Sequence, residues 1–134
     1  GFCENIPQMM DAIDILVHPC ENEPFGRVAI EAMAASRPVI GPNRGGIAES
    51  VVDGQTGLLV SAGDVEAFAQ AVAELKENPP LRQNMGQNGR RHVVSCFSLE
   101  QHVHRVQEVF TQSLKKYACR LANQSRFIKN ESQR

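Results

Sequence analysis

The sequence lacks the features that assign a chain to a nucleic-acid-binding or membrane-spanning class. Its net charge at pH 7 is only −1, so the chain as a whole has no electrostatic attraction to nucleic acid or anionic lipid. It has no apolar run near the roughly 20 residues that a transmembrane helix requires, and no recognisable signal peptide. With 134 residues, it is long enough for one domain with a buried core. We therefore expect a globular protein that binds no nucleic acid.

Cysteine is present, but not in a recognisable motif. The four cysteines lie far apart and form no C-x-x-C pair, at Cys3, Cys20, Cys96 and Cys119. Their spacing excludes the common zinc and disulfide-exchange motifs. We expect free, mostly buried thiols in a reducing, cytoplasmic compartment. The chain also begins at Gly1 and not at methionine, so we expect it to be a piece of a longer protein.

Apolar runs and helical periods alternate through the first 60 residues. The runs lack polar alternation, which is typical of strands buried on both faces. Strands are expected at 14–18, 38–41 and 57–60, with helices between them at 25–35 and 47–52. This order predicts an α/β fold, a Rossmann-like parallel sheet with flanking helices. Three strands are few for such a sheet, so we expect further strands upstream.

The second half of the sequence is helical and ends in a basic segment. Helix-start signals occur at Asp64, at Asn78 before two prolines, and at Ser98 with Gln101. From Ser113 onward there are six basic residues and one acidic residue. This segment is either a solvated helix and tail or a contact with an acidic membrane surface or another domain. We expect fraying from residue 123 onward.

The stretch PCENEPFGRVAIEAMA, residues 19–34, carries the chemistry. It follows the first predicted strand, and ligands of open parallel sheets bind outside the carboxyl ends of the strands. The helix predicted to start near Gly26 presents amides without helical partners at the positive end of its dipole, which is a ready phosphate site. Glycine there removes a side chain from the path of an anion.

Two glutamates, Glu23 and Glu31, flank this helix start. Glu31 lies roughly 7–8 Å along the helix axis from Gly26. Carboxylates accept hydrogen bonds from sugar hydroxyls, so two carboxylates around a phosphate site suit a nucleotide sugar. Two alternatives stay open on spacing alone. Glutamate is simply a good helix former, and paired carboxylates also serve in glycoside hydrolases.

Several motifs in order resemble one enzyme family. They are EPFGRVAIEAMA at 23–34, RPVI at 37–40, GGIAE at 45–49 and DGQTGLLV at 53–60. Together they resemble the C-terminal half of family-4 retaining glycosyltransferases, also called glycosyl transferases group 1. The resemblance extends from Gly1-Phe2 to about Phe110. It implies the donor-binding C-terminal domain of a GT-B fold, in which two Rossmann-like domains enclose a cleft.

The resemblance also implies roles for individual residues. Glu23 would bind hydroxyls of the donor sugar and is the catalytic candidate, although not as a nucleophile, and Glu31 would bind the ribose hydroxyls. Main-chain amides around Phe25, Gly26, Arg27 and Val28 would hold the sugar or diphosphate, and Pro24 belongs to the same substrate-binding segment. Lower-ranked candidates, each with a plain structural explanation, are His18, Gly45, Gly46 and Glu49. Surface ion pairs are the favoured use of Arg27 and Arg44.

The implied activity is transfer of a hexose-type sugar from a nucleotide diphosphate sugar to an acceptor hydroxyl, with retention of configuration and without a metal or other cofactor. A sugar or lipid-linked acceptor would bind mainly to an N-terminal domain outside this chain, so the chain alone should be inactive. Residues 1–112 would form the nucleotide-sugar-binding domain and residues 113–134 a basic helix or tail, with peripheral membrane contact possible. An inactive binding module and a nucleotide-sugar 2-epimerase are the alternatives.

The sequence departs from the family pattern at two positions near these motifs. Cys20 stands where the family often has serine, which affects a minor polar contact. Ser36 stands where it usually has glycine, the residue favoured at the end of a helix. We expect Ser36 to strain or reshape that helix end.

Overall fold

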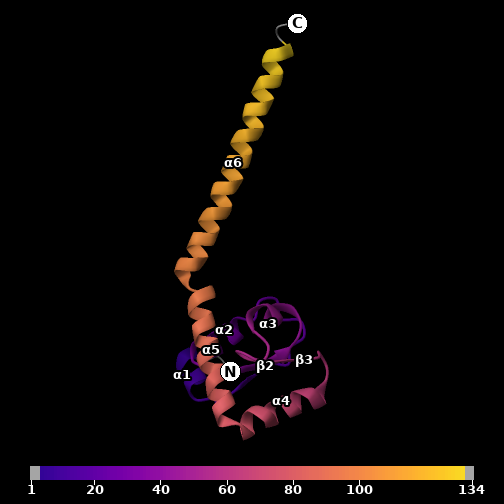
Figure 1. Cartoon of the computed structure of the whole chain (residues 1–134), viewed down its shortest axis with the longest axis vertical. Coiled ribbons are helices and arrows are strands. Elements are labelled where there is room, and N and C mark those ends of the chain that lie inside the picture. The colour runs from indigo at the N-terminus through magenta and orange to yellow at the C-terminus, as the bar shows by residue number, and fades with distance from the viewer. Residues whose placement is uncertain (1–3, 132–134) are drawn as a thin grey trace. The chain divides into compact units, whose positions relative to one another are not determined.

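The computed structural model describes residues 4–131 of the chain. Its elements (Figure 1) are α1 (Ile6–Asp11), β1 (Leu16–Val17), α2 (Arg27–Ala34), β2 (Val39–Pro42), α3 (Gly45–Ser50), β3 (Gly57–Val60), α4 (Val65–Glu77), α5 (Pro79–Cys96) and α6 (Leu99–Glu131). Alternating strands and helices are followed by helices alone, as the sequence predicts. The Rossmann-like α/β fold class is confirmed.

The three strands form one parallel sheet in the order β1-β2-β3. In the register, Leu16 pairs with Val39, and Val39 also pairs with Gly57. Strand β2 is therefore central, and all four of its residues are buried. Because the strands are parallel, the loops that follow β1 and β2 leave from the same edge of the sheet.

The sheet is covered by a separate apolar cluster on each face. Adjacent residues of a strand point to opposite faces, and in β2 Val39 belongs to one cluster while Ile40 belongs to the other. The first cluster is contributed mainly by α1, α2 and α3, and the second by α4 and α5. Strand β2 is thus buried on both sides, which explains its unbroken apolar sequence.

Helix starts are fixed by side chains that accept hydrogen bonds from exposed amides. Asp64 Oδ1 accepts from the Ala67 N–H at 2.9 Å, and Asn78 Oδ1 accepts from the Leu81 N–H at 3.1 Å. Each such cap contributes about 1 kcal/mol. Ser98 Oγ accepts from the Gln101 N–H at 3.3 Å, which is the serine half of the predicted capping box.

Three features differ from the sequence-based expectation. Helix α1 was not predicted, although Asn5 caps it and Pro7 stands in its first turn. Helix α3 begins at Gly45, inside the predicted turn, and Gly45 has a φ of +61°, which glycine tolerates at a tight entry to a helix. Helix α6 continues to Glu131 where fraying was expected, since this segment carries no proline or glycine to stop a helix.

The chain divides into two compact units, Gly1–Phe97 and Ser98–Arg134. The division expected from the sequence, at Ser113, stays a prediction. Within residues 4–131, no helix combines the length and the apolar character needed to cross a membrane. The Gly1-Phe2 motif lies outside the described residues.

The expectation of buried thiols is wrong for Cys20, which is exposed, while Cys96 is partly buried. The reason is local, since Cys20 lies in the loop after β1 and not on an element that packs against the core. Cys3 lies outside the described residues, and so does the side chain of Cys119.

Candidate functional site

The candidate site begins where β1 ends. The His18 N–H donates to the Ile40 carbonyl at 2.9 Å, which extends the pairing of β1 with β2 by one bond. The chain then leaves the sheet and reaches α2 through residues 19–26. The motif is therefore anchored at one end by the sheet and at the other by a helix.

Glu23 is fixed by the helix that follows it. Its Oε1 accepts a hydrogen bond from the Gly26 N–H at 3.1 Å, and its side chain is 28% exposed. The amide of Gly26 lowers the pKa of the Glu23 carboxyl; partial burial opposes this, while the Phe25 amide and the nearby His18 add to it. Glu23 is consequently a carboxylate at neutral pH with a defined orientation.

Within residues 4–131, the start of α2 leaves backbone donors without a partner. Gly26 caps the helix in the left-handed region with a φ of +74°, a conformation that costs other residues energy. The first bond within the helix is made by the Ala29 N–H, which donates to the Gly26 carbonyl at 2.9 Å. The amides of Arg27 and Val28 come before that bond, so they are the donors left for an anion. The Gly26 amide, in contrast, is already used by Glu23.

Gly45 and Gly46, at the start of α3, contact the loop formed by residues 19–26. The Gly46 N–H donates to the Glu23 carbonyl at 2.9 Å. A Cβ on Gly46 would overlap the backbone of Phe25, and one on Gly45 would lie 2.8 Å from the Glu23 carbonyl oxygen. The glycine pair therefore allows α3 to approach the loop closely. Glu49 of α3 is exposed, and the structure gives its side chain no ion pair within residues 4–131.

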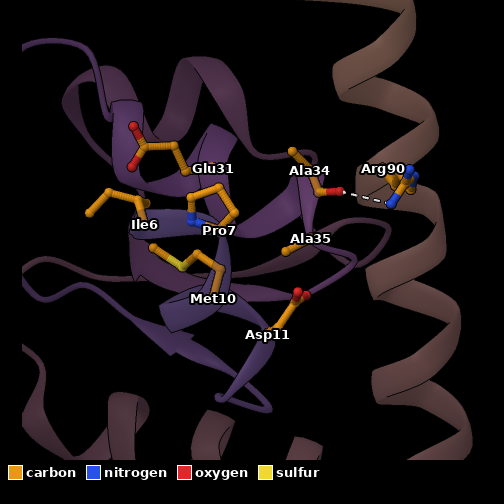
Figure 2. Close-up of a pocket in the computed structure, with 8 residues that line it drawn as sticks. All are labelled: Ile6, Pro7, Met10, Asp11, Glu31, Ala34, Ala35 and Arg90. Carbon is orange, nitrogen blue, oxygen red and sulfur yellow. Dashed lines mark hydrogen bonds between the residues drawn. The ribbon is translucent and has the colours of Figure 1, made fainter. Parts of the chain in front are cut away.

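Glu31 lies on α2, at the edge of a different surface. Its Oε1 is 3.7 Å from Arg27 Nη2, one turn earlier on the same helix. It also lines a cavity of about 420 Å³ formed by Ile6, Pro7, Met10, Asp11, Glu31, Ala34, Ala35 and Arg90. Figure 2 shows Glu31 at one end of this lining and Arg90 at the other, where Arg90 donates to the Ala34 carbonyl. Glu31 thus borders a partly apolar hollow between α1 and α2.

Both arginines near the motif form surface ion pairs, as expected. The Arg27 side chain is 83% exposed beside Glu31, and Arg44 Nη1 lies 4.0 Å from Glu21 Oε2. Neither is held against Glu23.

Two parts of the site were missed by reasoning from the sequence. The cavity beside Glu31 depends on Ile6, Pro7 and Met10 of α1, and the Asn5 cap with Pro7 was the signal that could have revealed this helix. Cys20 was treated as a minor departure, yet its thiol lies close to His18 and Glu23. That proximity follows from the turn at residues 21–22, which a linear pattern does not reveal.

Residues 1–92 match the family Glycosyl transferases group 1. This chain belongs to that family. The fold class and the family predicted from the sequence motifs are both confirmed, and the fold is of the GT-B type.

Relatives and solved structures support the same assignment. The chain is 35% identical over 118 residues to the D-inositol 3-phosphate glycosyltransferase of Streptomyces avermitilis, covering 88% of this chain and 25% of that protein. It is 35% identical to the sucrose-phosphate synthase of Thermosynechococcus elongatus, with a TM-score of 0.74, covering 81% of this chain and 27% of that one. It is 29% identical to Anabaena HepE in complex with UDP-glucose, with a TM-score of 0.76, covering 84% of this chain and 31% of that one. The chain thus spans less than a third of each of these proteins.

Proposed function

We propose that this chain is the donor-binding part of a retaining glycosyltransferase. The whole enzyme moves a hexose-type sugar from a nucleotide diphosphate sugar to an acceptor hydroxyl. The observation that carries the proposal is the placement of Glu23, an oriented carboxylate directly before a helix start that retains free amides. This combination offers acceptors to sugar hydroxyls and donors to a diphosphate within one short segment.

In this proposal, each part of the nucleotide sugar binds to a different group of the chain. The Arg27 and Val28 amides bind the diphosphate and stabilise the negative charge that grows on it as the bond from sugar carbon to phosphate oxygen breaks. Glu23 accepts bonds from the hexose hydroxyls. Glu31 accepts bonds from the ribose hydroxyls, and the apolar side chains of α1 beside it suit the flat face of a base.

The charge on Glu23 argues against its serving as the acid of a paired-carboxylate hydrolase. Such an enzyme needs one carboxyl with a raised pKa, so that it can protonate the leaving oxygen. The Gly26 amide moves the pKa of Glu23 in the opposite direction. Glu23 is therefore suited to accept hydrogen bonds and unsuited to donate a proton.

The remaining parts of the proposal concern the whole enzyme. Backbone amides take the place of a metal ion, the configuration at the sugar carbon is retained, and a sugar or lipid-linked acceptor binds to a second domain. A cytoplasmic location, with contact of the basic segment after Ser113 with a membrane surface, completes the proposal. Each of these rests on the family relationship and on the charge distribution of the sequence.

Calorimetry with UDP-glucose and a panel of other nucleotide sugars tests the assignment of Glu31. We expect Glu31→Ala in the whole enzyme to weaken binding of the preferred donor at least about 10-fold, because hydrogen bonds to a charged group contribute about 1.5–3 kcal/mol. Glu74→Ala is the matched control, since Glu74 is an exposed helical glutamate on α4. Equal donor affinity in the two variants would contradict the proposal. Turnover by the 134-residue chain alone would contradict the need for a second domain.

A further inference from the structure

A second chemistry-bearing cluster overlaps the candidate site. One donor atom each from His18, Cys20 and Glu23 lies within 4.8 Å of the other two. The three side chains offer an imidazole nitrogen, a thiol sulfur and a carboxylate oxygen. That set is typical of zinc sites, whereas calcium and magnesium prefer oxygen ligands alone.

The geometry of the histidine and the glutamate fits a shared metal ion. His18 Nε2 lies 3.4 Å from Glu23 Oε2. In a tetrahedral zinc site, nitrogen and oxygen ligands at about 2.0–2.2 Å from the metal lie about 3.4 Å from each other. The two atoms are therefore already spaced as ligands of one ion.

The ring nitrogen His18 Nε2 has no hydrogen-bond partner among the described residues. The atom is buried and has no hydrogen-bond partner within the described residues, because its contact with Glu23 lacks hydrogen-bond geometry. Buried polar atoms are nearly always bonded, so this nitrogen is available to a ligand. A metal ion between His18 and Glu23 satisfies the nitrogen lone pair.

The orientation of Glu23 also suits metal binding, because only one of its two carboxylate oxygens is held by the backbone. Its Oε1 is held by the Gly26 N–H at 3.1 Å, which leaves Oε2 facing His18. Such outer hydrogen bonds orient metal ligands and are a regular feature of metal sites. Cys20 is exposed, so its side chain can rotate toward the ion without disturbing the core.

We propose that His18, Cys20 and Glu23 bind a divalent ion of the zinc class. Three protein ligands leave the fourth position of a tetrahedral ion open for water. Binding requires the thiolate, so the Cys20 proton is released to solvent as the sulfur–metal bond forms.

The ion is an inhibitor and not a cofactor, and this part rests on the proposed function. Glu23 cannot bind the metal through Oε2 and serve the hexose hydroxyls with the same atom. Zinc and the sugar donor therefore compete, and Cys20 makes the enzyme sensitive to zinc. A serine at this position would lack the thiolate ligand that soft metals prefer.

Cobalt(II) is the probe for the metal site, because a thiolate bound to cobalt gives a charge-transfer absorption in the near ultraviolet. The 134-residue chain is prepared with Cys20 as its sole cysteine, the other three being serine. We expect a charge-transfer band that saturates at one equivalent of cobalt and disappears on addition of one equivalent of zinc. Absence of the band, in a chain whose circular dichroism matches the wild type, overturns the proposal.

A second chain supplies the matched control. Cys96 Sγ lies 3.7 Å from His92 Nδ1, so a chain with Cys96 as its sole cysteine also has a cysteine–histidine pair. The described residues place no carboxylate with that pair. We expect the Cys96 chain to bind cobalt at least about 10-fold more weakly than the Cys20 chain, because losing a group that supports a metal site commonly costs 10-fold or more in affinity. Equal affinities in the two chains would overturn the assignment, and His18→Ala in the Cys20 chain should lower its affinity to the control level.

Competition separates the metal site from the proposed function. We expect UDP-glucose, or the preferred donor from the calorimetric panel, to raise the apparent dissociation constant for cobalt in the whole enzyme. Donor binding that leaves cobalt affinity unchanged overturns the inhibitory role and keeps the metal site. Donor binding without a cobalt band overturns the metal site and keeps the proposed function.

Discussion

The two ends of helix α2 differ in how their backbone polar groups are bonded. At its carboxyl end, the backbone is closed by two bonds, from the Ser36 N–H to Met33 and from the Arg37 N–H to Ala32, both at 2.9 Å. Arg37 then ties this end to α1 by donating to the Met10 and Asp11 carbonyls. At its amino end, the only amide that a nearby side chain occupies is that of Gly26, within the described residues.

This difference separates stability from binding on a single helix. The carboxyl end satisfies its carbonyls inside the protein, so little remains there for a ligand. The amino end keeps the Arg27 and Val28 amides available and depends on α3 for its shape. Unmet donors at one end are tolerated because the other end and the core hold the helix in place.

Gly46→Ala tests whether the amino end depends on close packing. Its Cβ would overlap the Phe25 backbone, so we expect a loss of about 3 kcal/mol in the free energy of unfolding, measured by urea denaturation. Gly54→Ala is the control, because its φ is +70° but no atom lies within 4 Å of an added Cβ. That variant should lose about 1–2 kcal/mol from backbone strain alone. Equal losses would show that the approach of α3 to the loop is not tight.

Arg37→Ala and Arg27→Ala compare the two ends with the same substitution. Arg37 Nε and Nη2 donate to two carbonyls at 3.1 and 2.9 Å, so its removal should cost about 1–2 kcal/mol of unfolding free energy. Arg27 forms only an exposed ion pair with Glu31, so its removal should cost less than about 0.5 kcal/mol. Similar losses in the two denaturation curves would remove the distinction between the ends.

Ser36→Gly tests the strain at the carboxyl end. Ser36 has a φ of +59°, a region that costs a non-glycine residue energy, and it stands where a helix usually ends in glycine. We expect the substitution to raise the free energy of unfolding by about 1 kcal/mol. Ala35→Gly is the control, since Ala35 has a φ of −83° and gains nothing from glycine. A lower melting temperature for Ser36→Gly would contradict this account.

Local patterns predicted most of the fold. Strand β3 spans the predicted residues 57–60, and the caps at Asp64 and Asn78 lie where the sequence placed them. The strain at Ser36 was also predicted, and its positive φ confirms it. These features depend on neighbours within a few residues, which is why a sequence pattern reveals them.

The rest depends on contacts between segments. The family resemblance implied that amides from Phe25 to Val28 hold the donor, but the Gly26 amide is already used by Glu23 through a side-chain orientation that no pattern encodes. The cavity beside Glu31 needs α1 to pack against α2. The cluster at His18 needs a turn that brings Cys20 back toward the strand end. The assignment of ligand roles to the motif residues stays a prediction.

The hydrogen bond between the Gly26 N–H and Glu23 has a consequence for the entropy of recognition. A free glutamate side chain samples many rotamers and loses that freedom when it captures a ligand. Here the freedom is lost when the protein folds, so a sugar or an ion meets a side chain that is already ordered. Selectivity at this position then follows from the shape of a fixed carboxylate, and small changes in ligand geometry should produce large changes in affinity.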